Sequence, residues 1–243
     1  MLVRTCLGEE LTVNWQIHHR KATASTNLDA RGGVPGDVFT ADFQTAGRGR
    51  LDHVWHSSAG ENLMMSAVIS AAGLPPESAA TLPLVAGLAV AYAVERFVAP
   101  RRAQVKWPND VFLDGRKIAG ILCERVDDRI IVGIGVNVGE SSFPSAIVAR
   151  ATSLSREGVS ASVMAVRDEV LRHLADLTVR WRSAGFAVVQ AELAARDFLK
   201  GRQVLVRQTD HDDAPLGGLC DGICSDGALM VADTPVYAGE VQF

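Results

Sequence analysis

The hydrophobic and polar positions of the chain first predict a sheet covered by a long helix. Residues Asp37 to Gln44 alternate imperfectly between apolar and polar side chains, and Asn62 to Ser70 is a continuous apolar run. Both patterns are typical of strands in a mostly buried sheet. Residues Ala79 to Phe97 are rich in Ala, Leu and Val and exceed the usual length of a strand. We therefore expect a buried helix there.

The middle of the chain predicts consecutive antiparallel strands. Asp114-Gly115 is a strong signal for a short turn, and it separates two strand-like runs, Asp110 to Asp114 and Lys117 to Val126. A further run rich in β-branched residues extends from Arg129 to Val138. These runs together predict a β-meander.

The last part of the chain changes from helical to strand-like spacing. Ser160 to Arg182 repeats apolar residues at helical intervals, and Phe186 to Leu199 continues that pattern. After Lys200 the chain consists of short strand-like runs between Asp-, Gly- and Pro-rich turns, which favours a small β-barrel. We expect an α+β protein with two domains, residues 1–199 and 200–243.

Composition narrows the classes of partner. The chain has 243 residues, of which 48% are hydrophobic, and a formal net charge of −4. This charge gives no general attraction to nucleic acid or to anionic membranes. The longest apolar stretch, Leu82 to Val94, contains Pro83 and is short for a bilayer, and no secretory signal precedes it. We expect a cytoplasmic protein that binds small molecules or other proteins.

The four cysteines do not suggest a disulfide framework. Cys220 and Cys224 lie close together, but a structural zinc site needs four ligands and only His211 is near them in the sequence. We interpret these cysteines, with Cys6 and Cys123, as reduced thiols.

The loop from Gln44 to Arg50 carries the clearest chemical signal. It combines glycines, which let backbone amides approach an anion, with the guanidinium groups of Arg48 and Arg50. The pattern predicts an anion-binding loop. Short Arg/Gly runs also occur in disordered tails that bind nucleic acid, so the loop alone does not decide between these uses.

Further motifs in the same order resemble those of the biotin protein ligases, which activate biotin with ATP and attach it to a lysine of a carboxyl carrier domain. The resemblance implies a catalytic domain like that of class II aminoacyl-tRNA synthetases, followed by an SH3-like β-barrel. Its motifs cover most of the chain: Ser25-Thr26-Asn27, Gln44 to Arg50 ending at Trp55, Asn62-Leu63, Lys106 to Asp110, Arg116 to Leu122, Gly133 to Asn137, and Ala151 to Leu154.

Two features depart from patterns found in that family. Leu51-Asp52-His53 follows Arg50 where many members carry a glycine and a basic residue, which changes the stiffness and charge of the loop. Ser25 also lies too near the start of the chain to leave room for the winged helix-turn-helix of some members. We therefore expect no DNA binding and no repressor role.

The resemblance assigns the catalytic cations. Biotin and ATP are both anions, so their reaction requires positioned positive charge. Lys117 aligns with the lysine that the family uses at the α-phosphate and is our first catalytic candidate, with Arg50 and Lys106 as the others. Arg50 would bridge carboxylate and phosphate, and Arg48 would help to bind both ligands. Solvated surface side chains are the alternative for Arg48, Arg50 and Lys117.

Strict strand alternation creates a conflict at Lys117. It would place Lys117 on the face opposite Gly120 and Leu122, two residues that resemble biotin-pocket positions. A bulge or a turn distortion near Gly115 must reconcile them. Asp110 could orient the lysines, hold a water bound to Mg²⁺, or form only a structural pair with Lys106.

The remaining site residues are assigned to the two ligands. The ureido ring of biotin needs a few complementary polar groups within apolar walls. Ser25 could instead serve only as a helix N-cap, and Trp55 could belong to the core. The expected biotin site comprises Ser25, Thr26, Asn27, Gln44, Gly47, Arg48, Gly49, Arg50, Lys117, Gly120, Leu122 and Gly133, and the expected ATP site comprises Arg48, Arg50, Trp55, Lys117 and Asn137.

The resemblance therefore implies an ATP- and Mg²⁺-dependent ligase that forms biotinyl-5′-AMP and transfers biotin to a biotin carboxyl carrier protein. A lipoate-type ligase of the same fold is the nearest alternative, and a regulator that only senses biotin is another. The sequence leaves open whether the chain forms a homodimer.

Overall fold

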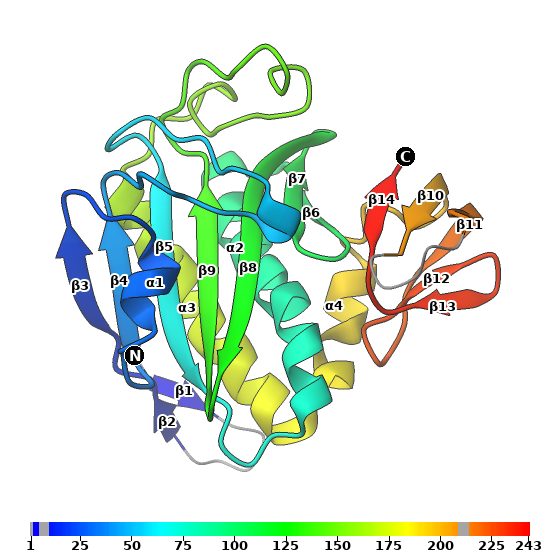
Figure 1. Ribbon diagram of the computed structural model, residues 1–243, viewed down its shortest axis with the longest axis horizontal. Coiled ribbons are helices and arrows are strands. Elements are labelled where there is room, and N and C mark those ends of the chain that lie inside the picture. Colours follow the sequence, from blue (N-terminus) through cyan, green and yellow to red (C-terminus); the bar gives the residue numbers. More distant parts are fainter. Residues whose placement is uncertain (1, 5–9, 209–213) are drawn as a thin grey trace.

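The computed structural model describes residues 2–4, 10–208 and 214–243, and its largest feature is a seven-stranded sheet (Figure 1). The strand order is β3-β4-β5-β9-β8-β7-β6. β3 and β4 are parallel, and every other neighbouring pair is antiparallel. The predicted β-meander is confirmed. The strands are β3 Gln16–Arg20, β4 Asp37–Ala41, β5 Leu63–Ser70, β6 Ala103–Lys106, β7 Asp110–Leu113, β8 Arg116–Val126 and β9 Arg129–Val136.

Two long helices cover one face of this sheet, and a short helix lies on the other (Figure 1). α2, Leu82–Val98, begins with a proline in its first turn, where the missing amide hydrogen costs no helical bond. It packs with α3, Val163–Ala184, behind the sheet, and their apolar side chains form the main core. The short α1, Thr26–Ala30, lies on the opposite face against β4 and β5.

The apolar composition of α2 follows from its position. Within the described ranges, one helical segment, Glu77–Val98, is long and apolar enough to cross a membrane by length and composition alone. In this fold, 67% of its apolar window is buried. Packing between the sheet and α3 accounts for that composition.

The expected helix from Phe186 to Leu199 is wrong in its second half. The 3-10 helix Phe186–Val189 leads into α4, Gln190–Ala194, and the chain then turns and makes a single parallel β-bridge with β6 at Asp197. Val105 of β6 donates to the carbonyl of Arg196 and accepts from the amide of Phe198. The Asp197 carboxylate accepts the amides of Leu199, Lys200 and Ile223. These bonds replace those that a continued helix would have made.

The C-terminal residues form a five-stranded antiparallel sheet in the order β13-β12-β11-β10-β14. Within residues 200–208 and 214–243, β13 and β14 do not pair with each other, so the strand order does not close the expected barrel. Trp107 Nε1 donates to the carbonyl of Gly227, which joins this sheet to the larger one. The strands are β10 Gln203–Arg207, β11 Leu216–Ile223, β12 Leu229–Val231, β13 Thr234–Val236 and β14 Glu240–Gln242; β1 Leu2–Arg4 and β2 Glu10–Thr12 form a separate pair.

The described cysteines are consistent with unreactive thiols. Burial raises the pKa of Cys123 strongly and that of Cys220 to about 11. Both are therefore protonated near neutral pH. No group of three or more His, Cys, Asp or Glu side chains gathers as a metal site in the described part of the chain. Cys6 and His211, which the interpretation of the cysteines also considered, lie outside the described residues.

Candidate active site

A cleft of about 1120 Å³ opens on the side of the sheet that carries α1. Its walls come from the loop after β4, from β8 and β9, from the segment between β9 and α3, and from β14. The cleft brings together all but one of the residues that the sequence assigned to a site. Those lining it are Ser25, Thr26, Asn27, Gln44, Arg48, Gly49, Arg50, Trp55, Lys106, Asp110, Lys117, Gly120, Leu122, Gly133 and Asn137.

Gly47 is the predicted site residue that does not line the cleft. Its carbonyl accepts the amide of Trp55, and a Cβ there would lie 3.1 Å from Gln44 Nε2. The absence of a side chain at Gly47 lets the loop pass close to the Gln44 side chain and the Trp55 backbone. The prediction that Gly47 contacts a ligand is therefore not supported by the geometry.

One end of the cleft holds a preformed polar cluster around α1. Gln44 Oε1 accepts from the Thr26 amide at 2.7 Å and from its hydroxyl at 3.1 Å. The Ser66 hydroxyl lies 2.8 Å from Thr26 Oγ1 and donates to Asn27 Oδ1 at 2.6 Å. Asn27 Nδ2 donates to Glu124 Oε2 at 2.6 Å. Each of these side chains is fixed by a neighbour before any ligand binds.

Ser25 occupies the N-cap position of α1, but its side chain makes no capping hydrogen bond. It is 7% exposed and lines the cleft. The interpretation of Ser25 as a side-chain cap is therefore wrong, because its hydroxyl accepts no amide from the first turn of α1.

Glycines on β8 and β9 make a floor on which Trp55 rests. A Cβ on Gly135 would lie 2.6 Å from the indole, and one on Gly120 would lie 3.2 Å from it. Trp55 Nε1 is buried, and no described residue accepts its hydrogen. Trp55 is thus part of the cleft, and the alternative that it belongs to the core is wrong.

A β-bulge settles the conflict at Lys117. Val111 of β7 faces Ala119, whereas the next residue, Phe112, faces Lys117. Ile118 is therefore the extra residue on β8, and it brings Lys117 to the same face as Gly120. Lys117 Nζ lies 3.4 Å from the position that a Cβ would take on Gly120. The predicted bulge is confirmed.

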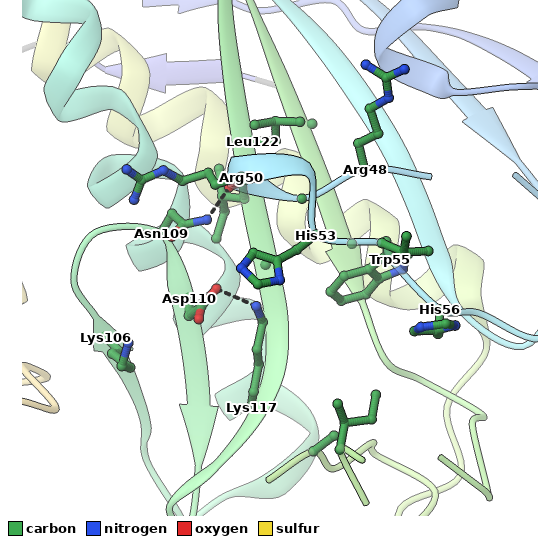
Figure 2. Close-up of a pocket in the computed structure, with 18 of the residues that line it drawn as sticks. Arg48, Arg50, His53, Trp55, His56, Lys106, Asn109, Asp110, Lys117 and Leu122 are labelled. Carbon is green, nitrogen blue, oxygen red and sulfur yellow. Dashed lines mark hydrogen bonds and ion pairs between the residues drawn. The ribbon is translucent and has the colours of Figure 1, made fainter. Parts of the chain in front are cut away.

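The cationic end of the cleft centres on an ion pair. Lys117 Nζ lies 2.6 Å from Asp110 Oδ1, an oxygen that is buried and accepts no hydrogen bond of good geometry from the described residues (Figure 2). Lys106 lies opposite Asp110 in the register of β6 and β7. Asp110 thus makes its close ion pair with Lys117. This contact is consistent with the prediction that Asp110 orients a lysine of the site.

The positive charges of Lys106 and Arg50 are buried and only partly compensated by nearby acids. Burial lowers the pKa of Lys106 despite the attraction of Asp110 and Glu240, and Lys117 and Arg50 lower it further. Burial also lowers the pKa of Arg50, again more than Asp110 and Glu240 raise it. An anion that enters here would regain electrostatic energy for both side chains.

The loop that carries the arginines folds back on itself. Gly49 donates its amide to the carbonyl of His53, and Arg48 forms a β-bridge with Val54. Leu51 adopts a left-handed φ of 50° at the tip. The guanidinium groups of Arg48 and Arg50 point in different directions (Figure 2).

His53, one of the residues that depart from the family pattern, contacts the C-terminal sheet. Its Nε2 lies 3.0 Å from Glu240 Oε1 on β14. The loop is therefore linked to a part of the chain far away in sequence.

Asn137 is buried with a partly used side chain. Its Nδ2 donates to the carbonyl of Thr152 at 3.0 Å. Its amide oxygen is thus the group left to accept a hydrogen bond from a ligand.

Several lining residues were missed from the sequence. Gly135 lies within the Gly133 to Asn137 motif, and its spacing from Gly133 could have indicated it. Glu240 and Phe243 enter from β14 and the residue that follows it, and nothing in the local sequence marks them. Phe243 packs on Phe112 and Phe198, and Lys106 Nζ lies 5.6 Å from its ring centre.

Comparisons with known proteins agree with this geometry. Residues 22–140 match the model of the biotin/lipoate A/B protein ligase family. A biotin–[acetyl-CoA-carboxylase] ligase of Mycobacterium tuberculosis is 35% identical over 218 residues, which cover 86% of this chain and 80% of the relative. A ligase of the same description from Paracoccus denitrificans is 34% identical and covers 86% of this chain and 91% of the relative.

A solved structure extends the match to the whole fold. The biotin protein ligase of Aquifex aeolicus in complex with biotin and ATP superposes with a TM-score of 0.82 at 27% identity. The match covers 93% of this chain and 97% of that one.

The fold, the cleft and these matches define one class: the chain belongs to the biotin/lipoate A/B protein ligase family. Its similar relatives within that family are the biotin protein ligases.

Proposed function

We propose a two-step reaction for this chain, which is an ATP-dependent biotin protein ligase. In the first step a biotin carboxylate oxygen attacks the α-phosphorus of ATP. The bond to the β-phosphate oxygen breaks, and pyrophosphate leaves. In the second step a carrier lysine amine attacks the carbonyl carbon of biotinyl-5′-AMP, an amide forms, and AMP leaves with the electron pair of the broken C–O bond.

The observation that carries this proposal is the joining of two unlike surfaces in one cleft. The polar cluster of Thr26, Asn27 and Gln44 lies at one end, and Lys106, Lys117 and Arg50 lie at the other. A ligand that fits both must carry a neutral polar ring and an anion. Biotin has that form, with a ureido ring at one end and a carboxylate at the other.

At the first end, fixed polar groups bind the ring. Ser25 presents its hydroxyl, and Gln44 presents an amide nitrogen because its oxygen is already occupied by Thr26. Gly133 and Leu122 form part of the floor, and the absence of a side chain at Gly133 leaves room for the Asn27 amide, whose oxygen a Cβ there would overlap.

At the second end, cations hold the reacting anions. Lys117 exchanges Asp110 for the α-phosphate and offsets the charge that develops on it. Arg50 bridges the biotin carboxylate and the phosphate, while Arg48 and Lys106 contribute further charge. Trp55 and Asn137 contact the adenine. The folded loop keeps water from the mixed anhydride.

Mg²⁺ fits this site only together with ATP. The described residues hold no cluster of three protein ligands, and Mg²⁺ commonly takes one or two carboxylates plus phosphate oxygens. Asp110 is the carboxylate that would hold it or its bound water. Such an ion would supply positive charge to the phosphates.

We further propose the organisation and the partners. Residues 1–199 form the catalytic domain, of the class II aminoacyl-tRNA synthetase type, and residues 200–243 are the counterpart of an SH3-like barrel. The protein substrate is a biotin carboxyl carrier protein in the cytoplasm, with no role for DNA or membrane. Whether two copies associate as a homodimer is decided by measuring the mass in solution.

One assay tests the function. The purified chain is mixed with biotin, MgATP and a carrier domain, and both pyrophosphate and the mass of the carrier are measured. We expect one biotin per carrier. Replacing biotin with lipoate tests the alternative ligase, and an enzyme that prefers lipoate would overturn the proposal. Biotin binding without turnover would favour a regulator instead.

A further inference from the structure

A short segment after β9 continues the sheet directly beside Lys117. The Lys117 amide donates to the carbonyl of Arg150 at 2.8 Å, and its carbonyl accepts the Thr152 amide at 2.9 Å. The two chains form a parallel β-bridge. Among the described residues, those that hold the backbone of Lys117 on this side are 150–152, in an isolated bridge outside the main strands.

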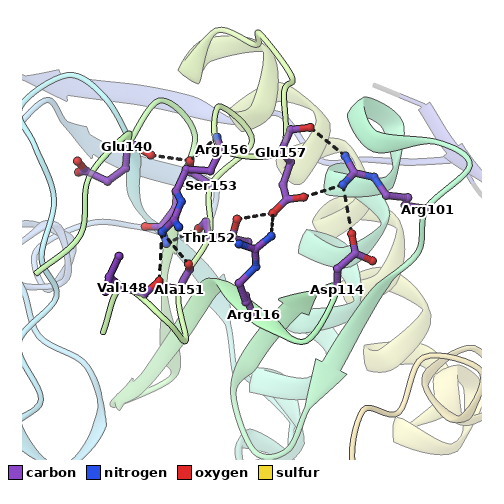
Figure 3. Close-up of polar contacts among 11 residues, drawn as sticks. Arg101, Asp114, Arg116, Glu140, Val148, Ala151, Thr152, Ser153, Arg156 and Glu157 are labelled. Atoms are coloured by element: carbon purple, nitrogen blue, oxygen red, sulfur yellow. Dashed lines mark hydrogen bonds and ion pairs between the residues drawn. The ribbon is translucent and has the colours of Figure 1, made fainter. Parts of the chain in front are cut away.

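Glu157 binds the side chains next to both partners of that bridge (Figure 3). Its Oε1 lies 2.7 Å from a guanidinium nitrogen of Arg116, the residue before Lys117, and also accepts the hydroxyl of Thr152. Its Oε2 lies 2.7 Å from Arg101, whose guanidinium also reaches Asp114 at 3.2 Å. One carboxylate thus joins β8 to the segment that pairs with it.

The Glu157 side chain is well suited to this task because it is almost fully buried and charged. It is 6% exposed, while its two arginine partners are 33% and 35% exposed. Burial alone would raise its pKa, but hydrogen bonds from Thr152 and Arg101 and the charge of Arg116 lower it below the usual range. The carboxylate therefore keeps its charge, and its contacts, at neutral pH.

No atom of Glu157, Arg101 or Arg116 lines the cleft in the described structure. Glu157 therefore reaches the cleft only through its partners, of which Arg116 and Thr152 flank the bridge to Lys117. We propose that Glu157 is a positioning residue for Lys117: it ties Arg116, the residue before Lys117, to Thr152 in the bridging segment, and so aims the ammonium at the α-phosphate. This inference rests on the proposed role of Lys117.

The test compares Glu157→Gln with Glu95→Gln. Glu95 is also partly buried and bonds one arginine, Arg196, through both oxygens, at 2.9 and 2.8 Å, but it lies outside the cleft. At saturating ATP we expect Glu157→Gln to lower kcat for pyrophosphate release about tenfold and to leave KM for biotin within twofold. Glu95→Gln should lower the melting temperature similarly but keep the kcat of the original chain.

A double-mutant cycle with Lys117→Ala shows whether Glu157 acts through Lys117. A residual rate is expected for Lys117→Ala, because the other groups still bind both substrates, and it is measured with enzyme in excess. In that background Glu157→Gln should have no further effect. An undiminished tenfold loss there would overturn the proposal.

Two further results separate the possible failures. If Lys117→Ala keeps its full rate, the proposed role of Lys117 is wrong; if only Glu157→Gln keeps its full kcat, the positioning role alone is wrong. Should Glu157→Gln fail to fold, Thr152→Val removes one of its hydrogen bonds while keeping the shape. We then expect a kcat loss of about threefold, and an unchanged kcat would contradict the proposal.

Discussion

The two ends of the cleft differ in how far they are satisfied before substrates arrive. Around α1, Thr26, Asn27 and Gln44 already hold one another and Ser66 by hydrogen bonds. At the other end, burial lowers the pKa of Lys106 and of Arg50, so nearby acids do not fully compensate their charge. The end proposed to bind the ring is therefore preorganised by hydrogen bonds. The end proposed to bind phosphate instead holds buried cations whose charge is only partly compensated.

This difference suits the chemistry. A neutral ring is recognised by hydrogen bonds of fixed geometry, and preorganised groups lose little entropy when it binds. The transferring phosphate gains charge only during the reaction, and buried cations act most strongly on charge that develops late. Mutations at the first end should therefore change biotin affinity, and mutations at the second end should change the rate.

The largest effect is expected at Lys117. Lys117→Ala removes the ammonium that would stabilise the charge on the α-phosphate, and comparable losses of one transition-state partner cost roughly 10²- to 10³-fold in kcat. Pyrophosphate release measures this loss, and KM for biotin should change little. A normal rate of pyrophosphate release by this variant would show that Lys117 is not the cation that stabilises the α-phosphate.

Gly133→Ala should affect the opposite end. A Cβ there would overlap Asn27 Oδ1 and disturb its bond from Ser66. Overpacking of this kind costs ~1–3 kcal/mol, so we expect KM for biotin to rise about tenfold while kcat stays near its original value. Gly32→Ala is the matched control, because no atom lies within 4 Å of the added Cβ. A fall in kcat without a change in KM would break the division between the two ends.

Arg50→Gly tests retention of the intermediate. The guanidinium would hold biotinyl-5′-AMP by its phosphate, so its loss should release the mixed anhydride into solution. We expect biotin to appear on lysines of a bystander protein such as albumin, as detected by mass spectrometry. If an active variant labels only the carrier, Arg50 is not the residue that retains biotinyl-5′-AMP.

The sequence predicted those parts of the fold that depend on local spacing. The hairpin around Asp114-Gly115 and the helices α2 and α3 follow from periodicity within one segment. The bulge beside Lys117 was predictable because Lys117 and Gly120 were both assigned to the site, and regular strand alternation would have placed them on opposite faces.

Features set by distant contacts were not predictable from the sequence. The β-bridge at Asp197 is stabilised by hydrogen bonds with Val105 of β6 and by the amide of Ile223, and neither partner is near in sequence. Glu240 was not predicted either, because it reaches the cleft from the last strand, far in sequence from the other site residues. Gly47 was placed in the ligand site because its motif does not show which glycine faces inward.

The smallest effect should appear in the alkaline limb of the pH profile, and it concerns Lys106. Because burial lowers the pKa of Lys106 below the ordinary lysine value of 10.5, its positive charge is lost at a lower pH than that of an exposed lysine. As pH rises through this lowered pKa, kcat/KM for adenylate formation should fall. Lys106→Arg keeps its charge throughout this range, so the fall should move to higher pH. If the limb stays in place, another group titrates there, and the phosphate end does not depend on the charge of Lys106.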